Sequence, residues 1–468
     1  MIRLALADLR DSWVAWVGVS LTFVVTNAAL ATCLIFADSV TVGIAAGTAT
    51  GEDIEAVRAL PYLNLVLTCL VALAVIGAAT NLVVSARRSA IARLLLGGAT
   101  PGQLVRFLGA QLVVVALAGA IVGDLVALAV TPTVIDAVAR DRGVTVFAMS
   151  VDPATLLSAN LGCIALSVIG GLRQARAASR IPPVEALREA SSGSATRLSR
   201  ASVVLRWLRF GLIALLVVAA FPGYRAVAPE LGSDALAQLM QLAVVLVPLA
   251  GLALAAIMPW IVGPLTSGWT RLVPGGAAWH LARHTVVAKA DRMVRSVLPI
   301  MFATGLGFGM LMIGDTLVDA LRIAGGPVQI SGAGPMAVLT TIGLALAVSV
   351  AGSVGNLVMM SRQRSAELAL GGIVGASPGQ QVLVPALEAL ILTVTAAALG
   401  FVMAATGASV LAYGLAITLP GASVSFPWAM LGWTALGCLV VALLATVLPV
   451  LTSLREPAPR VLARLVGA

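Results

Sequence analysis

Long apolar stretches free of Asp, Glu, Lys and Arg recur along the whole chain. A hydrocarbon core about 30 Å thick needs about 20 apolar residues per helical span. These stretches lie at 11–38, 58–87, 106–124, 152–173, 234–271, 295–315, 322–362 and 388–455. The last stretch is interrupted near 418–423 and holds the end of one span and the whole of another, so nine spans fit in all. The pattern predicts a polytopic membrane protein.

A tenth span is less obvious, because residues 207–224 are few and include Arg209. Without it, one of two basic blocks, Arg173–Arg209 or Arg271–Arg295, would face outside, whereas cytoplasmic loops normally carry the excess of Lys and Arg. We therefore predict an all-α protein with ten transmembrane helices and both termini in the cytoplasm of a bacterial plasma membrane. The outer loops then hold five of the 29 basic residues.

Composition agrees with a location in the bilayer. The 468 residues are 60% hydrophobic and 10% charged, whereas about a quarter of the residues in soluble domains are charged. The formal charge of +9 is explained by cytoplasmic anchoring beside anionic lipid, so we predict no nucleic-acid partner. His280 and His284 lie four residues apart without a nearby third ligand, so we predict a surface helix there and no metal site.

A short polar motif occurs twice, as GATPGQ at 98–103 in the first half of the chain and as GASPGQ at 375–380 in the second. Its surroundings match too: Asn81-Leu82-Val83 corresponds to Asn356-Leu357-Val358, and Gln111 to Glu388. We infer a duplication of four spans, giving a four-two-four arrangement with two parallel repeats. The predicted parts are a first unit at 1–190, a linker with helices five and six at 191–276, and a second unit at 277–468.

Each motif has the pattern of a helix end followed by the start of a new helix. Thr100 to Gln103 and Ser377 to Gln380 fit a capping box with proline at the first helical position, and the glycine before each suits the end of a previous helix. We therefore predict short surface helices at 89–98 and 365–375, each rigidly joined to two spans. Such a helix can transmit an external push into the bilayer, although a well-capped turn would have the same sequence.

These residues carry a resemblance to a known family. Basic residues, a glutamate, alternating apolar residues, then Gly-Ala-Ser/Thr and glutamine resemble the loop between the second and third spans of FtsX-like permeases, the MacB-type branch of ABC transporters. Residues 175–190, ARAASRIPPVEALREA, are similar to the family's tail after the fourth span, and 454–468 match it loosely. The ten-span organisation is similar to that of bacitracin-resistance permeases.

The resemblance implies a transport subunit, not an enzyme, whose surface helices couple to an ABC ATP-binding subunit, two copies in all. ATP and Mg would be bound by that partner, and no cofactor or catalytic residue is expected in this chain. Consistent with this, no G-x-x-x-x-G-K-[ST] motif is present, and Lys289 is the only lysine. The implied first coupling element comprises Arg87, Arg88, Leu94, Gly98, Thr100 and Gln103, and the second Arg362, Arg364, Glu367, Leu370, Gly375, Ser377 and Gln380.

The chain departs from the family pattern in two places. Glu367 keeps the family's glutamate, but Ala90 replaces it in the first unit, so the two ATPase contacts are expected to be unequal. The outer segments 38–60 and 315–335 are short, so the large extracellular domain of relatives is missing. Signalling to a wall hydrolase is therefore less favoured than transport.

Two acids fall within predicted spans, Asp124 and Glu388. A charge at the centre of a membrane helix costs about 2.5–3.5 kcal/mol on insertion scales, which invites a functional interpretation. However, we expect Asp124 to reach the outer interface and Glu388 to lie near the inner leaflet. Hydrogen bonding between helices or interfacial placement is thus favoured over substrate contact.

We hypothesise an ABC permease that exports or extracts a hydrophobic or amphipathic substrate, such as a peptide antibiotic, lipid or drug. One alternative is a secondary transporter, but such proteins place ionisable groups and broken helices near the midplane, and the apolar stretches here are nearly free of charge. The other alternative is an FtsX-like regulator of cell-wall hydrolases that transports nothing.

Overall fold

The computed structural model describes residues 8–10, 13–51, 53–178, 200–227, 233–288, 290–323, 335–363, 372, 375–419 and 421–453. Within these ranges the regular structure is helical and contains no strand.

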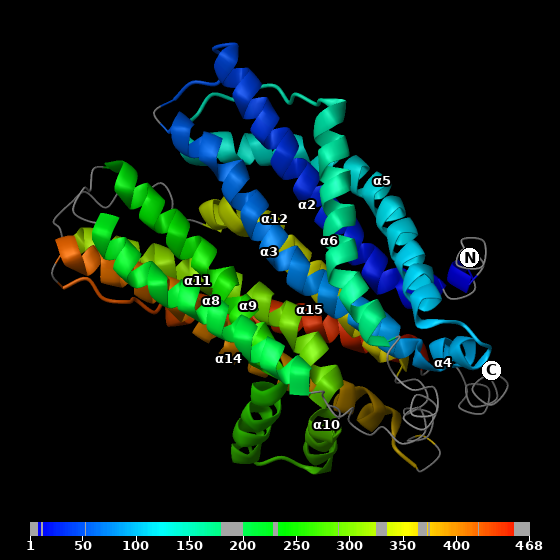
Figure 1. The fold of residues 1–468 in the computed structure, drawn as a ribbon. Coiled ribbons are helices and arrows are strands. Elements are labelled where there is room, and N and C mark those ends of the chain that lie inside the picture. Colours follow the sequence, from blue (N-terminus) through cyan, green and yellow to red (C-terminus); the bar gives the residue numbers. More distant parts are fainter. Residues whose placement is uncertain are drawn as a thin grey trace.

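Twelve helices make up the described part of the chain (Figure 1). Those of the first unit are α2 (Trp13–Ala45), α3 (Ile54–Ala86), α4 (Arg88–Leu96), α5 (Pro101–Arg142) and α6 (Pro153–Ala178). The linker contains α8 (Arg200–Val227) and α9 (Ser233–Leu272). The second unit contains α10 (Ala277–Ala288), α11 (Ala290–Ile323), α12 (Pro335–Gln363), α14 (Pro378–Thr418) and α15 (Trp428–Ser453).

Nine of these helices are long and apolar enough to cross a membrane, namely α2, α3, α5, α6, α9, α11, α12, α14 and α15. The protein is therefore a multi-pass membrane protein. Helix α8, which covers the predicted tenth span, is a continuous helix that exposes Leu208, Leu212 and Leu215. It is not one of the nine, so the tenth span and the four-two-four count stay predictions.

The two units pack their helices in the same way. In the first unit α2 packs against α3, α5 and α6, and in the second α11 packs against α12, α14 and α15. Gly123 in α5 approaches Asn27 in α2 too closely for any side chain, and Gly400 in α14 approaches Thr304 in α11 in the same manner. The two pairs are related by the same shift in numbering as the two hexapeptides, so they occupy equivalent places in the repeat.

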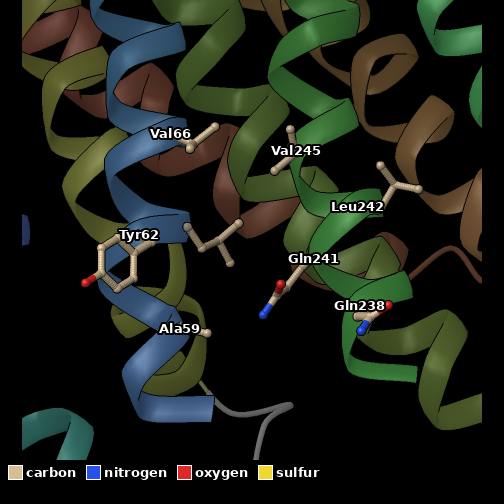
Figure 2. Close-up of a pocket in the computed structure, with 8 residues that line it drawn as sticks. Ala59, Tyr62, Val66, Gln238, Gln241, Leu242 and Val245 are labelled. Carbon is tan, nitrogen blue, oxygen red and sulfur yellow. The ribbon is translucent and has the colours of Figure 1, made fainter. Parts of the chain in front are cut away.

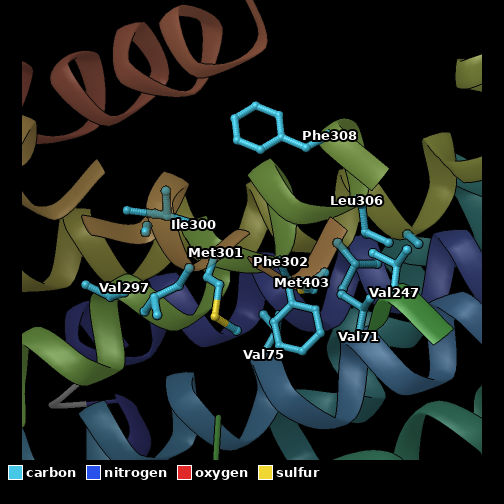
Figure 3. Packing of buried hydrophobic residues seen from close by; sticks show 14 of the residues in the cluster. Val71, Val75, Val247, Val297, Ile300, Met301, Phe302, Leu306, Phe308 and Met403 are labelled. Atoms are coloured by element: carbon cyan, nitrogen blue, oxygen red, sulfur yellow. The ribbon is translucent and has the colours of Figure 1, made fainter. Parts of the chain in front are cut away.

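The units meet where α3 and α12 pack together, with α2 against α12 and α3 against α11. Gly18 in α2 and Gly355 in α12 bring their backbones together: a Cβ on either would lie 2.5 Å from the other's carbonyl oxygen. One apolar core runs through both units, and Figure 3 shows Val71 and Val75 of α3 beside Phe302 of α11. The linker helix α9 packs on α3, α11 and α14.

Helix α5 is longer than the sequence pattern predicted. We expected the third span to end near Asp124, but α5 continues to Arg142 and ends at Gly143, which has a left-handed φ of 62°. Its last turns form an apolar cluster with the ends of α2 and α3, and Phe147 stacks on Phe36 there. A single charge marked the expected boundary, but the apolar periodicity continues beyond it, so the helix does too.

Two connections of the first unit, α2 to α3 and α5 to α6, which the sequence predicts on the outer side, are joined by hydrogen bonds. The Thr145 amide donates to the Thr50 carbonyl at 3.0 Å, and the Thr145 hydroxyl donates to the Thr48 carbonyl at 2.7 Å. These two short loops are therefore held together at one end of the first unit.

Candidate functional site

The first coupling element folds as its sequence predicts. Helix α4 ends at Leu96, and Gly98 follows it with a φ of +89°, a conformation that favours glycine. Thr100 then caps α5: the Gln103 amide donates to its Oγ1 at 3.3 Å, and its own amide donates to Gln103 Oε1 at 3.0 Å. The capping box and the proline at the first helical position are thus both present.

The second coupling element has the same local structure where it is described. Gly375 has a φ of +100°, and Ser377 caps α14, accepting from the Gln380 amide at 3.3 Å and donating its amide to Gln380 Oε1 at 3.0 Å. Arg362 lies in α12, while the proposed contact residues Arg364, Glu367 and Leu370 lie outside the described residues, as does most of the predicted helix 365–375.

Helix α4 is fixed to the start of α5 by a small apolar cluster. Ile91 is buried against Leu104, Phe107 and Leu108, and Leu94 packs against the same cluster. Leu96, at the end of α4, is 57% exposed, although the family resemblance did not mark it. Helix α4 is thus held on one side by apolar packing and presents a leucine at its tip.

Arg87, a predicted coupling residue, faces inward. Its side chain is 10% exposed and forms an ion pair with Asp8, and its Nη1 donates to Gln111 Oε1 at 3.1 Å. Gln111 in turn donates through Nε2 to Asp8 Oδ2 at 2.7 Å. This network ties the N-terminal segment to the end of α3 and the beginning of α5. The sequence marked Gln111 only as part of the repeat, and Asp8 carried no signal.

The two intramembrane acids lie at different levels. Glu388 is 3% exposed, lies in the first turns of α14 and occupies the place of Gln111 in the repeat. Asp124 lies in the middle of α5, where its carboxylate accepts hydrogen bonds from Asn27 of α2 at 2.8 Å and Asn160 of α6 at 2.9 Å. Because α5 continues for several turns beyond it, Asp124 is not at the end of its helix as expected. Neither asparagine stood out in the sequence.

Comparison with protein families decides the class of the molecule. The family model described as FtsX-like permease C-terminal matches residues 62–183 and again 339–458, together just over half of the chain. This chain belongs to the FtsX-like permease family. The matches run from α3 through α6 and from α12 through α15, the equivalent helices of the two units. No curated protein matches the chain.

This FtsX-like permease has an open cleft of about 460 Å³ between α3 of the first unit and α9 of the linker. Figure 2 shows Tyr62 on one wall and Gln241 and Gln238 on the other, with Val66 and Val245 further along the helices. The α3–α9 cleft thus has polar groups at one end and apolar walls at the other.

Proposed function

We propose that this FtsX-like permease is the membrane subunit of an ABC transporter, in which separate ATPase subunits drive export or extraction of a hydrophobic or amphipathic substrate. The observation that carries this proposal is the pair of coupling elements, in which a left-handed glycine and a capping box recur at equivalent places of the two units. Two such elements in one chain suit an ATPase dimer, each subunit meeting one element.

The packing of α4 supports a mechanical role. A push on α4 reaches α5 through the buried Ile91 cluster and reaches α3 through the network at Arg87. We interpret Arg87 as a residue that positions the coupling element, and the exposed Leu96 as part of the partner surface. ATP and Mg would be bound and used on the partner, while this chain supplies the moving helices.

The α3–α9 cleft supports an amphipathic substrate. In the predicted orientation, with both termini in the cytoplasm, α3 begins at the outer side, so Tyr62 and Gln238 lie nearer the outer surface than Val66 and Val245. A polar head beside the amides and an apolar chain against the valines would fit this gradient. Extraction from the outer leaflet follows from the same orientation.

The proposal is tested by recovering the complex from native membranes. Affinity purification of the permease should bring down an ATP-binding protein, and replacing Arg362 and Arg364 by Glu should reduce the recovered amount about tenfold, because charge pairs at an interface are worth about 1.5 kcal/mol or more. Arg58→Glu with Arg140→Glu is the matched control, since these exposed arginines lie in the predicted outer segments.

Three results would contradict the proposal in different ways. If the permease is recovered alone, the proposed ATPase partner is contradicted. Substrate uptake driven by an ion gradient in ATP-free vesicles would favour a secondary transporter. A wall-hydrolase defect on deletion, with unchanged tolerance of amphipathic compounds, would favour the regulatory role.

A further inference from the structure

Three polar side chains meet inside the helix bundle of the first unit. The Asp124 carboxylate of α5 accepts from Asn27 Nδ2 of α2 on Oδ1, at 2.8 Å, and from Asn160 Nδ2 of α6 on Oδ2, at 2.9 Å. Asn27 also donates to the Ala120 carbonyl at 3.0 Å. We call Asp124, Asn27 and Asn160 the Asp124 site. Both oxygens of the carboxylate are therefore held in place by amides from two other helices.

No positive charge balances this carboxylate within the described part of the chain. The ion pairs of these residues involve other acids, and Asp124 is bonded there to neutral amides. An ionised carboxylate offers about four lone-pair directions, of which the two amides use two. Asp124 is half-buried, and its neighbours Ile121 and Leu125 are exposed on the lipid-facing surface of α5. Asp124 therefore borders the exposed apolar surface of α5.

The two asparagines hold the carboxylate through their amide N–H groups. Asn27 is completely buried, and neither its Oδ1 nor that of Asn160 accepts a hydrogen bond from any described residue. Because each asparagine directs an N–H group at the carboxylate, the positive end of its amide dipole faces Asp124 and stabilises the ionised carboxylate. The site still carries a net negative charge, which attracts a cation strongly in a medium of low dielectric constant.

The site lies in the outer half of the membrane in the predicted orientation. Counting 1.5 Å per helical residue from Trp13, Arg106 and Arg173, the three side chains lie roughly 20–27 Å from the inner ends of the spans, in a hydrocarbon core about 30 Å thick. The head of an amphiphile in the outer leaflet is therefore within reach.

The second unit has no such site. Thr304, Phe401 and Ala435 stand at the equivalent positions of the repeat, and none of them carries a charge. Gly123 and Gly400 nevertheless pack in equivalent ways beside them. Helix packing at this level thus needs no carboxylate, which separates the Asp124 site from the architecture shared by the two units.

We infer that the Asp124 site binds the positively charged head of an amphipathic substrate, and that this head carries N–H groups, as a primary ammonium does. The carboxylate supplies the counter-charge and two remaining acceptor positions. A primary ammonium can donate N–H groups to them, whereas a quaternary ammonium has none to donate. Asn27 and Asn160 are positioning residues that fix the carboxylate. The inference rests on the proposed transport of amphipathic molecules, but binding to this site requires neither ATP nor the ATPase.

The test uses the purified permease in phosphatidylcholine nanodiscs, without ATPase or ATP, and measures binding of dodecylamine and dodecyltrimethylammonium by calorimetry. The unmodified protein should bind dodecylamine about tenfold more tightly than the quaternary amine, and Asp124→Asn should remove that difference, because a neutral amide keeps the shape and loses the charge. Asp315→Asn is the matched control: Asp315 accepts from Ser425 near the outer end of α11.

Equal affinity for the two amines, or unchanged dodecylamine binding by a folded Asp124→Asn variant, would overturn the inference. If that variant fails to fold, Asn160→Ala keeps the charge and should reduce the preference for the primary amine. Nanodiscs containing phosphatidylethanolamine identify the natural source: competition with dodecylamine indicates a lipid head, and no competition indicates a soluble amphiphile. Failure to recover an ATPase from membranes would challenge the transport proposal while leaving this binding result unaffected.

Discussion

At the residue scale, the network at Arg87 contains a carboxylate that the second unit carries on a different helix. In the first unit the carboxylate comes from Asp8 and the amide from Gln111. At the corresponding positions of the second unit stand Thr285 and Glu388. Each unit therefore keeps one carboxylate at this level, on the N-terminal segment in the first and on the third span in the second.

We therefore expect the stability lost by removing the Asp8 carboxylate to be restored by placing a carboxylate at position 111. Asp8→Asn should lower the stability of the protein by about 1.5–3 kcal/mol, since it weakens charged hydrogen bonds around a buried guanidinium. Adding Gln111→Glu should restore most of the loss, because the pair then matches the second unit. Melting temperatures in detergent would measure both effects. A double variant no more stable than Asp8→Asn alone would show that the two arrangements are not equivalent.

The difference between Ala90 and Glu367 gives a second prediction at this scale. Ala90→Glu supplies the glutamate that the family resemblance expects in the first coupling element, and we expect it to strengthen binding of the ATPase severalfold, whereas Glu367→Ala should weaken it. Titration of the purified ATPase against each variant measures this. Equal binding by all variants would mean that the glutamate plays no part in the contact.

At the element scale, the closeness of α2 and α12 depends on two residues without side chains. Gly18→Ala would place a Cβ 2.5 Å from the Gly355 carbonyl oxygen, so the helices must move apart. We expect a loss of about 1–3 kcal/mol, the usual cost of overpacking. Gly77→Ala in α3 is the matched control, because a Cβ there meets nothing within 4 Å and alanine favours helix.

Thermal unfolding of the two variants should therefore shift in opposite directions. If Gly18→Ala is as stable as Gly77→Ala, the backbone contact between the units is not tight. The comparison needs no substrate or partner, and it probes the joint between the units separately from their coupling elements.

Element ends were predictable where local chemistry determines them. Thr-Pro-Gly-Gln and Ser-Pro-Gly-Gln specify a cap, a first helical residue and a side chain that bonds back to the cap, all within one helical turn. The predicted end of α5 was wrong because a single charge was taken as the boundary, although the apolar pattern continues beyond it to residues that pack with Phe36 and Phe147. The partners of Asp124 come from two other helices, and a hydropathy pattern carries no information about such contacts.

At the scale of the whole molecule, the span count depends on α8. If α8 crosses the membrane, its two ends lie on opposite sides. In a variant lacking the four native cysteines, Ser233→Cys should react with an impermeant maleimide in intact cells, and Ala201→Cys only after permeabilisation. Thr48→Cys, in the exposed outer connection of the first unit, is the control for external labelling. Labelling of both positions from one side would reduce the count to nine.

The repeat was predictable at this scale, because two copies of one sequence pattern must bury equivalent faces. The differences between the two units were not predictable. They arise from single substitutions, and the neighbours of each substituted residue are known only from the folded structure. Phe401 in place of Asp124 changes a polar site into an apolar one, and the cleft depends on where the linker helix α9 packs against α3.

The crossing of Gly18 and Gly355 also determines how the two units can move. Neither glycine has a side chain that must change rotamer when the helices rotate against each other, although the Met359 side chain of α12 lies beside Gly18. Where α3 meets α11, Arg295 of α11 bonds to Ser85 of α3 at 2.6 Å, and any rotation must stretch or exchange that bond. We therefore expect that any rotation of the two units about the Gly18–Gly355 contact would break the hydrogen bond between Arg295 and Ser85.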